Sequence, residues 1–416
     1  MTIKKLNAGA LQLVTFITVV IALLLGCFIL LVHTQKQFRV KSYLLTDTIQ
    51  NADKGISFAL KNSSTKQDSV ALLLDNDATV KLKTAFWGTF LKVGVSSKFK
   101  NFKFKKTALL GSKQPLKQSA LYLKEHNKPL VLVGNTKIKG NTYLPRQGVK
   151  SGNISGQSYN GHQFVDGVTK TIQQFPKLSF QTRNYIQNIH EFYNSKKDLE
   201  SFQIKSGSSV SNSFEKPTLF HFSINDIFLD NITVQGNLVI QSDSKITISD
   251  SAILKDIILI APKIEIADKV KGTFQAFATE HILVGKDCNL SYPSALVLAK
   301  NYSKQFEENN IIEIDSGTKL QGNIILLGRK GSKNYNPQIA LNTNTIVEGE
   351  VYCEQTLELK GKVYGTVFTD AFITRANGSY YQNHLLNAEI NSKKLDLEYI
   401  GLPITNTEKG VAKWLY

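Results

Sequence analysis

The chain has 416 residues, with 50 Lys and Arg against 33 Asp and Glu, which leaves a formal net charge of +17 at pH 7. That length suffices for one elongated or two compact domains with a hydrophobic core, and the spread-out positive charge favours solubility and attraction to anionic surfaces. The three cysteines include no CxxC pair and no cluster with histidine, so neither a zinc site nor any other cofactor is predicted.

An apolar segment near the N-terminus is the first predicted element. No charged residue occurs between Lys5 and Lys36, and residues 10–32 are almost wholly apolar. A helix needs roughly 20 such residues to span a bilayer. The run is longer than the apolar core of a cleaved secretory signal, and no small-x-small cleavage site follows it. We therefore expect a single-pass anchor in a bacterial inner membrane, with lipidation at Cys27 as a minor alternative.

The orientation rests on the short leader, residues 1–9, because the basic residues on the two sides of the apolar run nearly balance. We expect the leader in the cytoplasm and the rest of the chain in the periplasm or outside the cell. Apolar residues then recur at three-, four- and seven-residue intervals through residues 33–62. This pattern predicts one helix from about Leu11 to Lys61, whose amphipathic second half packs against the soluble domain through Phe38, Leu45, Ile49, Ala52, Ile56 and Leu60.

The leader resembles that of a type IV prepilin or a minor pseudopilin of type II secretion, because two lysines precede Gly9 and an apolar helix follows it. The resemblance implies cleavage between Gly9 and Ala10, a long N-terminal helix and assembly with other pilus-like proteins. One residue departs from the pattern, since Val14 stands where most pilins carry Glu. A plain signal anchor is the alternative.

The body of the chain resembles uncharacterised envelope proteins from Bacteroidota. The residues that carry this resemblance are Asp75–Asp77, Trp87 with Gly88, and the segment from Pro129 to Pro145. It implies an envelope location and no particular activity.

Residues 63–228 are predicted to form a β-rich domain, with a surface helix near residues 181–200. Within it, the densest basic patch is expected on one strand that alternates Phe with Lys. The lysines of this predicted anionic-surface patch are Lys98, Lys100, Lys103, Lys105 and Lys106. Interleaved aromatic and basic residues can bind single-stranded nucleic acid, but this pattern more often indicates a strand with one apolar face and one lysine-bearing face. We therefore favour an anionic glycan or lipid surface over nucleic acid.

Residues 229–400 carry a recurring apolar-x-Gly-x-apolar unit. Its copies centre on Gly236, Gly272, Gly322, Gly349 and Gly361, with an earlier, weaker one at Gly140. Short alternating segments lie between them, namely Ile246–Ile248, Ile264–Ile266 and Ile312–Ile314. Together they predict an irregular parallel β-solenoid, with a β-sandwich as the alternative, followed by a tail over residues 401–416.

The solenoid raises an enzyme alternative, because some glycan-active enzymes use this fold with clustered carboxylates. The candidate acids are Asp250, Asp256, Asp268, Asp287, Glu313 and Asp315. Exposed turns account for each of them singly, so no catalytic residue is predicted. Cys288 and Cys353 are open to two interpretations, a disulfide or two buried thiols.

The sequence thus predicts a mainly β protein behind a long N-terminal helix, with a structural or assembly role in a bacterial envelope. Its expected partners are the lipid bilayer, other envelope or pilus-like proteins, and an anionic glycan surface. A membrane-tethered glycan-active enzyme, a bactofilin-like scaffold and an adhesin are the alternatives.

Overall fold

The computed structural model describes residues 8–62, 69–73, 78–114, 118–195, 200–300, 310–328, 336–404 and 407–415. Most of the predicted leader and the Asp75–Asp77 motif lie outside these ranges. The chain divides into two compact units. The first contains the N-terminal helix through Ser57 with Ser69–Leu82 and Val95–Lys105, and the second contains Lys83–Gly94 and the chain from Lys106 onward.

The N-terminal helix is continuous from the apolar run into the amphipathic segment, as the sequence predicts. Helix α1 (Ala8–Asn62) has 55 residues, which corresponds to a length of about 82 Å at 1.5 Å per residue. Its apolar part has a mean hydropathy of 3.0 over its best window and none of that window is buried, so α1 is long and apolar enough to cross a membrane.

The buried stripe of α1 begins further along the chain than predicted. Phe38 is 74% exposed and Leu45 is 43% exposed, so the prediction that both pack against the protein's own soluble part is wrong. Burial starts at Thr48 and continues through Asn51, Ala52, Gly55 and Ile56. Helical spacing predicts which residues share a face, but it cannot predict how far along that face the covering strands reach.

A small sheet joins the two ends of the β-rich part of the chain. Its strands lie in the order β1 (Ser69–Leu73), β2 (Thr79–Trp87), β3 (Phe90–Phe99), β4 (Phe102–Lys113) and β31 (Ile400–Gly401), with β32 (Lys409–Leu415) also on β4. Both C-terminal strands pair antiparallel with β4. Everything between β4 and β31 is therefore an insertion into this sheet. The predicted tail, residues 401–416, contains all of β32 and the second residue of β31.

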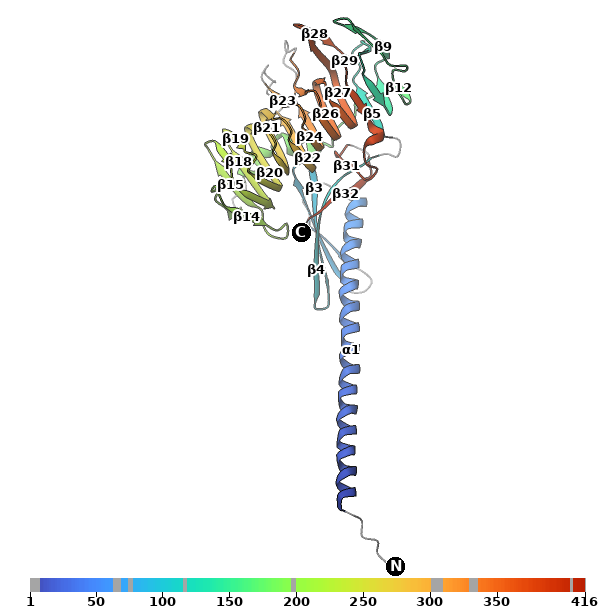
Figure 1. The fold of residues 1–416 in the computed structure, drawn as a ribbon, viewed down its shortest axis with the longest axis vertical. Coiled ribbons are helices and arrows are strands. Elements are labelled where there is room, and N and C mark those ends of the chain that lie inside the picture. The colour runs from blue at the N-terminus through green and yellow to red at the C-terminus, as the bar shows by residue number, and fades with distance from the viewer. Residues whose placement is uncertain are drawn as a thin grey trace, which may run out of the picture. The chain divides into compact units, whose positions relative to one another are not determined.

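The inserted segment forms a parallel β-solenoid (Figure 1). Three ladders of parallel strands, which we call faces 1, 2 and 3, run along it. Six long strands turn from one face to the next: β20 (Ile253–Ile266), β21 (Lys271–Val284), β22 (Asn289–Ala299), β24 (Lys319–Leu327), β26 (Ile346–Leu359) and β27 (Lys362–Ala376). The sequence-based prediction of a mainly β fold with a parallel solenoid is confirmed.

Shorter strands complete the three ladders. Face 1 adds β14 (Ser209–Asn212), β17 (Thr233–Gly236), β30 (Glu389–Asn391) and β7 (Lys137–Lys139). Face 2 adds β13 (Glu200–Ser201), β15 (Leu219–Ser223), β18 (Leu238–Ser242), β5 (Ser119–Leu123), β8 (Asn141–Leu144) and β12 (Thr169–Thr171). Face 3 adds β16 (Ile227–Leu229), β19 (Lys245–Ile248), β23 (Ile311–Ile314), β25 (Ile339–Leu341), β29 (His384–Leu386), β6 (Leu130–Val133) and β9 (Val149–Ser151). Two hairpin pairings, β10 (Asn153–Ile154) with β11 (Gln157–Ser158) and β28 (Ser379–Gln382) with the end of β27, branch from the coils.

The coils do not stack in the order of the sequence. Strands β5, β7 and β8, from the N-terminal part of the insertion, lie beyond β27 and β30 from its C-terminal part (Figure 1). The solenoid thus includes strands on both sides of the boundary that the sequence analysis placed at residue 228. At the junction the Ser392 hydroxyl, in the 3-10 turn η1 (Ser392–Lys394), donates a hydrogen bond of 3.2 Å to the carbonyl oxygen of Gln118. We call this non-covalent junction the seam.

The two larger hydrophobic clusters of the described residues lie inside and outside the solenoid. The inner core fills the solenoid with inward aliphatic side chains such as Leu254, Leu290, Leu320 and Val347. Cys288 and Cys353 belong to it as free thiols, and burial raises the pKa of Cys353 to about 12. Of the two interpretations that the sequence left open, the structure shows the separate thiols.

The second core covers the outer side of face 2. Phe277, Val297, Ile325 and Tyr352 point outward from the ladder, and they form one cluster with Trp87 of the small sheet. Two short helices join this cluster, α2 (Phe180–Gln187) and α3 (Ile189–Asn194). The helix predicted near residues 181–200 is present, but as two short helices that break at Asn188. Face 2 is covered, whereas faces 1 and 3 carry the charged outward rows.

Candidate functional site

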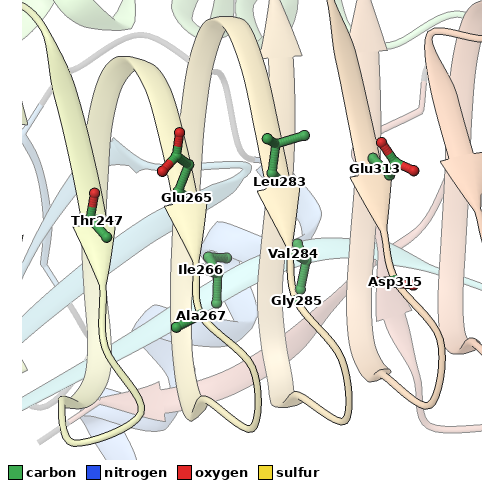
Figure 2. A pocket seen from close by; sticks show the side chains of 9 residues that line it. All are labelled: Thr247, Glu265, Ile266, Ala267, Leu283, Val284, Gly285, Glu313 and Asp315. Atoms are coloured by element: carbon green, nitrogen blue, oxygen red, sulfur yellow. The ribbon is translucent and has the colours of Figure 1, made fainter.

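A groove of about 500 Å³ on face 3 is the candidate site. Each coil contributes one outward side chain to its floor. Because the parallel registers pair Thr247 with Glu265, Glu265 with Leu283, and Leu283 with Glu313, these four residues form one column across consecutive coils. Figure 2 shows Glu265 and Glu313 on the two sides of Leu283. Asp315, the first residue after β23, also lines the groove.

Local sequence explains why these side chains point outward. In a strand, neighbouring side chains alternate between the two faces, so the isoleucines of Ile264–Ile266 and Ile312–Ile314 enter the inner core and the glutamate between them faces solvent. Ile264, Ile266, Ile312 and Ile314 are all at most 3% exposed. The groove is therefore a product of the alternation that builds the solenoid.

Basic residues on the neighbouring outward row partly neutralise the negative charge of Glu265. The Lys245 ammonium lies 3.3 Å from one of its carboxylate oxygens, and Nε2 of His281 lies 3.8 Å from the other. Burial lowers the pKa of His281, and the neighbouring Glu265 carboxylate opposes that shift. Glu313 accepts a hydrogen bond of 3.3 Å from the Asn342 amide. The groove is thus acidic at the Glu313 and Asp315 end and nearly balanced at the Glu265 end.

The structure divides the acids that the sequence singled out. Glu313 and Asp315 line the groove, whereas Asp250, Asp256, Asp268 and Asp287 do not. Asp256 pairs with Lys413 at 2.6 Å, and Asp268 accepts a hydrogen bond of 2.7 Å from the backbone of Lys286. Across the described ranges, no group of three His, Cys, Asp or Glu side chains is arranged to hold a metal ion.

Sequence reasoning did not identify Glu265 as a groove residue or His281 as its neighbour. The signal was present, since the middle residues of Ile246–Ile248, Ile264–Ile266 and Ile312–Ile314 are the ones that form the column. Their irregular spacing along the chain concealed the alignment, because coils of different length still place equivalent residues side by side.

The predicted basic patch has a different shape from the one expected. Residues 98–106 are not one strand, because β3 ends at Phe99 and β4 begins at Phe102, with Lys100 at φ +52° in the turn. Lys98, Lys100, Lys103 and Lys105 are exposed around this hairpin turn. Lys106 instead lies over the ring of Trp414, at 4.0 Å from its centroid.

The predicted processing site lies at the start of α1. Gly9 and Ala10 fall in its first turn and both are exposed. No heavy atom lies within 4 Å of the position that a side chain on Gly9 would take. Cleavage between them stays a prediction.

Comparisons with known proteins add little to this description. No family model matches the chain, and no curated protein matches it. Among solved structures, the crystal structure of the competence-associated pilin ComZ from Thermus thermophilus is similar at 9% identity and a TM-score of 0.21, over 89% of this chain and 96% of that one. We draw no conclusion from a likeness of this strength. The resemblance to Bacteroidota envelope proteins stays a prediction.

Proposed function

We propose that this chain is a membrane-anchored structural protein of a bacterial envelope that assembles with pilin-like subunits through α1. In this proposal the apolar half of α1 lies in the inner membrane and the β-rich part lies on the periplasmic or outer side. The observation that carries the proposal is the exposed apolar stretch of α1 beyond the membrane-spanning length. Phe38, Val40, Tyr43 and Leu45 are each at least 43% exposed.

The length of α1 supports an assembly role in addition to anchoring. A membrane needs roughly 20 residues, which the run to Val32 supplies, and burial against the small sheet begins only at Thr48. Along the roughly 15 residues between them, or about 22 Å of helix, Phe38, Val40, Tyr43 and Leu45 remain exposed in the described part of the chain. Exposed apolar patches on a folded protein typically mark sites of protein association. Helices of neighbouring subunits would cover Phe38 and Leu45, which lie seven residues apart on one face.

The processing half of the proposal is tested by the mature N-terminus. Mass spectrometry of the protein purified from its own membrane should find Ala10 as the first residue if the leader is removed as in a prepilin. Replacing Gly9 with Leu should then leave the leader attached. An intact leader on the wild-type chain would remove the prepilin interpretation and leave a plain signal anchor.

The assembly half is tested by cysteine crosslinking in cells. In a Cys27→Ser background, Leu45→Cys should give crosslinked species with neighbouring subunits when a short bifunctional maleimide is added. Gln50→Cys is the matched control, because it is exposed on a different side of the same helix. Equal crosslinking at both positions, or none at Leu45→Cys, would contradict assembly through this face.

A glycan-active enzyme remains the second candidate function, and the groove is the observation that favours it. Glu265 and Glu313 stand two coils apart, so their backbones are separated by about 9.5 Å. Inverting glycosidases place their two carboxyl groups about 6.5 to 9.5 Å apart. Incubating the purified chain with envelope glycan should release new reducing ends under this alternative, and Glu313→Gln should abolish that release. The structural proposal expects no release from either protein.

A further inference from the structure

The outward rows of face 1 carry a regular series of lysines that neither the anchor nor the groove uses. Parallel pairing aligns Lys271, Lys319, Lys362 and Lys137 along one row, and we call these four residues the lysine row. They come from β21, β24, β27 and β7. The inward neighbours of the row, including Leu320 and Val363, are fully buried, so the lysines point to the solvent side of the ladder.

The spacing within the row is constant. One residue of another kind stands between successive lysines, namely Asn289, Ile346 and Glu389. Adjacent strands in a sheet lie about 4.8 Å apart, so a lysine recurs about every 9.5 Å and the row spans roughly 29 Å. The solenoid thus presents positive charge at a fixed interval along a straight line.

The row is available for a partner. In the part of the chain that the structure describes, no acidic side chain lies within ion-pair distance of Lys137, Lys271 or Lys362. Lys319 lies 2.7 Å from Glu348, and both side chains keep part of their exposure. Glu389, the one acid within the row, is engaged by Lys394 at 3.5 Å.

The second outward row of face 1 supplies neutral polar groups beside the lysines. Thr273, Gln321 and Tyr364 are its neutral members on β21, β24 and β27. Hydroxyl and amide side chains of this kind hydrogen-bond sugar hydroxyls as readily as water does. Lys139 and Lys255 extend the positive charge at the two ends of this row.

We propose that face 1 binds an extended acidic polysaccharide that carries one carboxylate per disaccharide, with the glycan lying along the solenoid axis over the lysine row. The two-coil interval is comparable with the length of a disaccharide in an extended chain, so successive carboxylates meet successive lysines. This inference does not rest on the assembly role of α1.

Nucleic acid fits the row less well. A DNA strand carries one phosphate per 3.4 Å along its axis, so lysines at the two-coil interval would meet about one phosphate in three. Single strands are held by stacking their bases on aromatic side chains. Tyr364, the aromatic residue of the second row, already has the Lys394 ammonium over its ring at 4.1 Å from the centroid.

Binding of hyaluronan oligosaccharides to the full chain in detergent tests the proposal. Hyaluronan has one carboxylate per disaccharide, and its carboxyl-reduced form is the uncharged comparison. The variant Lys137→Gln, Lys271→Gln, Lys319→Gln and Lys362→Gln should bind at least about tenfold more weakly than wild type, because it removes four exposed ion pairs with the glycan. The carboxyl-reduced oligosaccharide should bind the wild-type chain more weakly than hyaluronan does, by a similar factor.

A matched variant removes the same charge elsewhere. Lys81→Gln, Lys83→Gln, Lys170→Gln and Lys216→Gln change exposed lysines outside both the lysine row and the predicted anionic-surface patch, and should leave binding within about twofold. Circular dichroism confirms that both variants fold. If both variants weakened glycan binding equally, the effect would depend only on net charge, and the proposal would be overturned. Row-dependent binding of a DNA duplex that is tighter than that of hyaluronan would overturn it in favour of nucleic acid.

Discussion

At single positions, the backbones of neighbouring coils approach one another very closely at the corner between faces 1 and 2. Gly322, Gly349 and Gly365 stack on one another there, each at a positive φ between 139° and 154°. A Cβ on Gly349 would lie 1.9 Å from the carbonyl oxygen of Gly322, and one on Gly365 would lie 1.8 Å from that of Gly349. Only glycine combines this backbone conformation with such a close approach.

Replacing Gly349 with Ala should lower the free energy of unfolding by at least about 2 kcal/mol, because the change adds a backbone clash to an unfavourable φ. Chemical denaturation followed by tryptophan fluorescence measures the effect. Gly148→Ala is the control, because Gly148 also has a positive φ, +65°, but has open space around it. A loss no larger for Gly349→Ala than for Gly148→Ala would show that the coils can separate at this corner.

Glu350, the next residue, is a buried carboxyl group. Gln114 and the backbone N–H of Leu402 donate hydrogen bonds of 2.6 Å and 2.5 Å to its two oxygens. Burial nevertheless dominates and raises the pKa of Glu350 to about 7. The group ties the residues that follow β31 and β4 to the solenoid and should make the fold sensitive to pH.

The direction of that sensitivity follows from proton binding. Since the folded state binds the Glu350 proton more tightly than the unfolded state, stability is full below the unfolded pKa and falls as pH rises toward 7. The loss should amount to about 3 kcal/mol between pH 5 and pH 8. Glu350→Gln should flatten this slope, whereas Glu398→Gln, at an exposed carboxylate, should keep it. An unchanged slope in Glu350→Gln would assign the pH dependence to other groups.

The corner glycines also show how much of the solenoid geometry could be predicted from the sequence. The apolar-x-Gly-x-apolar unit correctly marked Gly140, Gly236, Gly322 and Gly349, all at positive φ. It misplaced Gly361, which precedes β27 while Gly365 occupies the corner. The unit detects a glycine between aliphatic residues. Which glycine lies at the corner is decided by the ladder register, and that register depends on the neighbouring coils rather than on the local sequence.

Among the elements, α1 and the small sheet make the closest helix-to-strand contact of the first unit. A Cβ on Gly55 would lie 2.8 Å from a methyl carbon of Val80 and 2.8 Å from one of Val95. The helix backbone at Gly55 thus packs directly on the side chains of Val80 in β2 and Val95 in β3. The sequence predicted the helix and its apolar spacing, but nothing in it marked Gly55 as the contact, because an isolated glycine in a helix usually indicates weakness.

Gly55→Val should disrupt this packing and destabilise the sheet against the helix by about 1 to 3 kcal/mol, because the branched side chains of Val80 and Val95 have little freedom to move aside. Hydrogen exchange of β2 and β3 amides in the detergent-solubilised chain reports the change locally. Gly94→Ala serves as the control, since its nearest neighbour, the Thr107 hydroxyl, lies 3.8 Å away. Unaltered exchange in Gly55→Val would show that the helix and sheet separate freely.

The hairpin of β3 and β4 illustrates the opposite kind of error. Three phenylalanines among lysines suggested one alternating strand, but Phe99 and Phe102 are three residues apart, which breaks a two-residue period. Lys100 adopts the left-handed turn conformation at that break. Lysine is an unusual residue for such a turn, so turn chemistry supplied no signal.

For the molecule as a whole, the solenoid is an insertion that enters and leaves at one place. The strands that flank it, β4 and β31, pair with each other, with Gly401 opposite Ser112. The sequence predicted the solenoid but not this connection, because pairing between residues so distant along the chain leaves no periodic trace.

Residues 118–395 expressed alone should keep their parallel coils but expose the outer side of face 2. Phe277, Val297, Ile325 and Tyr352 would lose Trp87 and Leu415, which belong to the same cluster. We expect strong binding of a hydrophobic dye and concentration-dependent association, as large exposed apolar patches favour both. The full chain in detergent is the comparison, after subtraction of a dye blank for the micelle. A monomeric fragment without excess dye binding would show that face 2 needs no cover.

The seam has a consequence for how the protein is made. Strands β5 to β8 leave the ribosome early, but the strands on which they stack, β27 and β30, are synthesised near the end of the chain. The N-terminal coils therefore have an unpaired ladder edge until the C-terminal coils have been synthesised. Contacts between residues so far apart in the sequence also form slowly. An exposed parallel edge is prone to pair with other chains. Folding of this protein thus calls for protection of its N-terminal coils until translation is nearly complete.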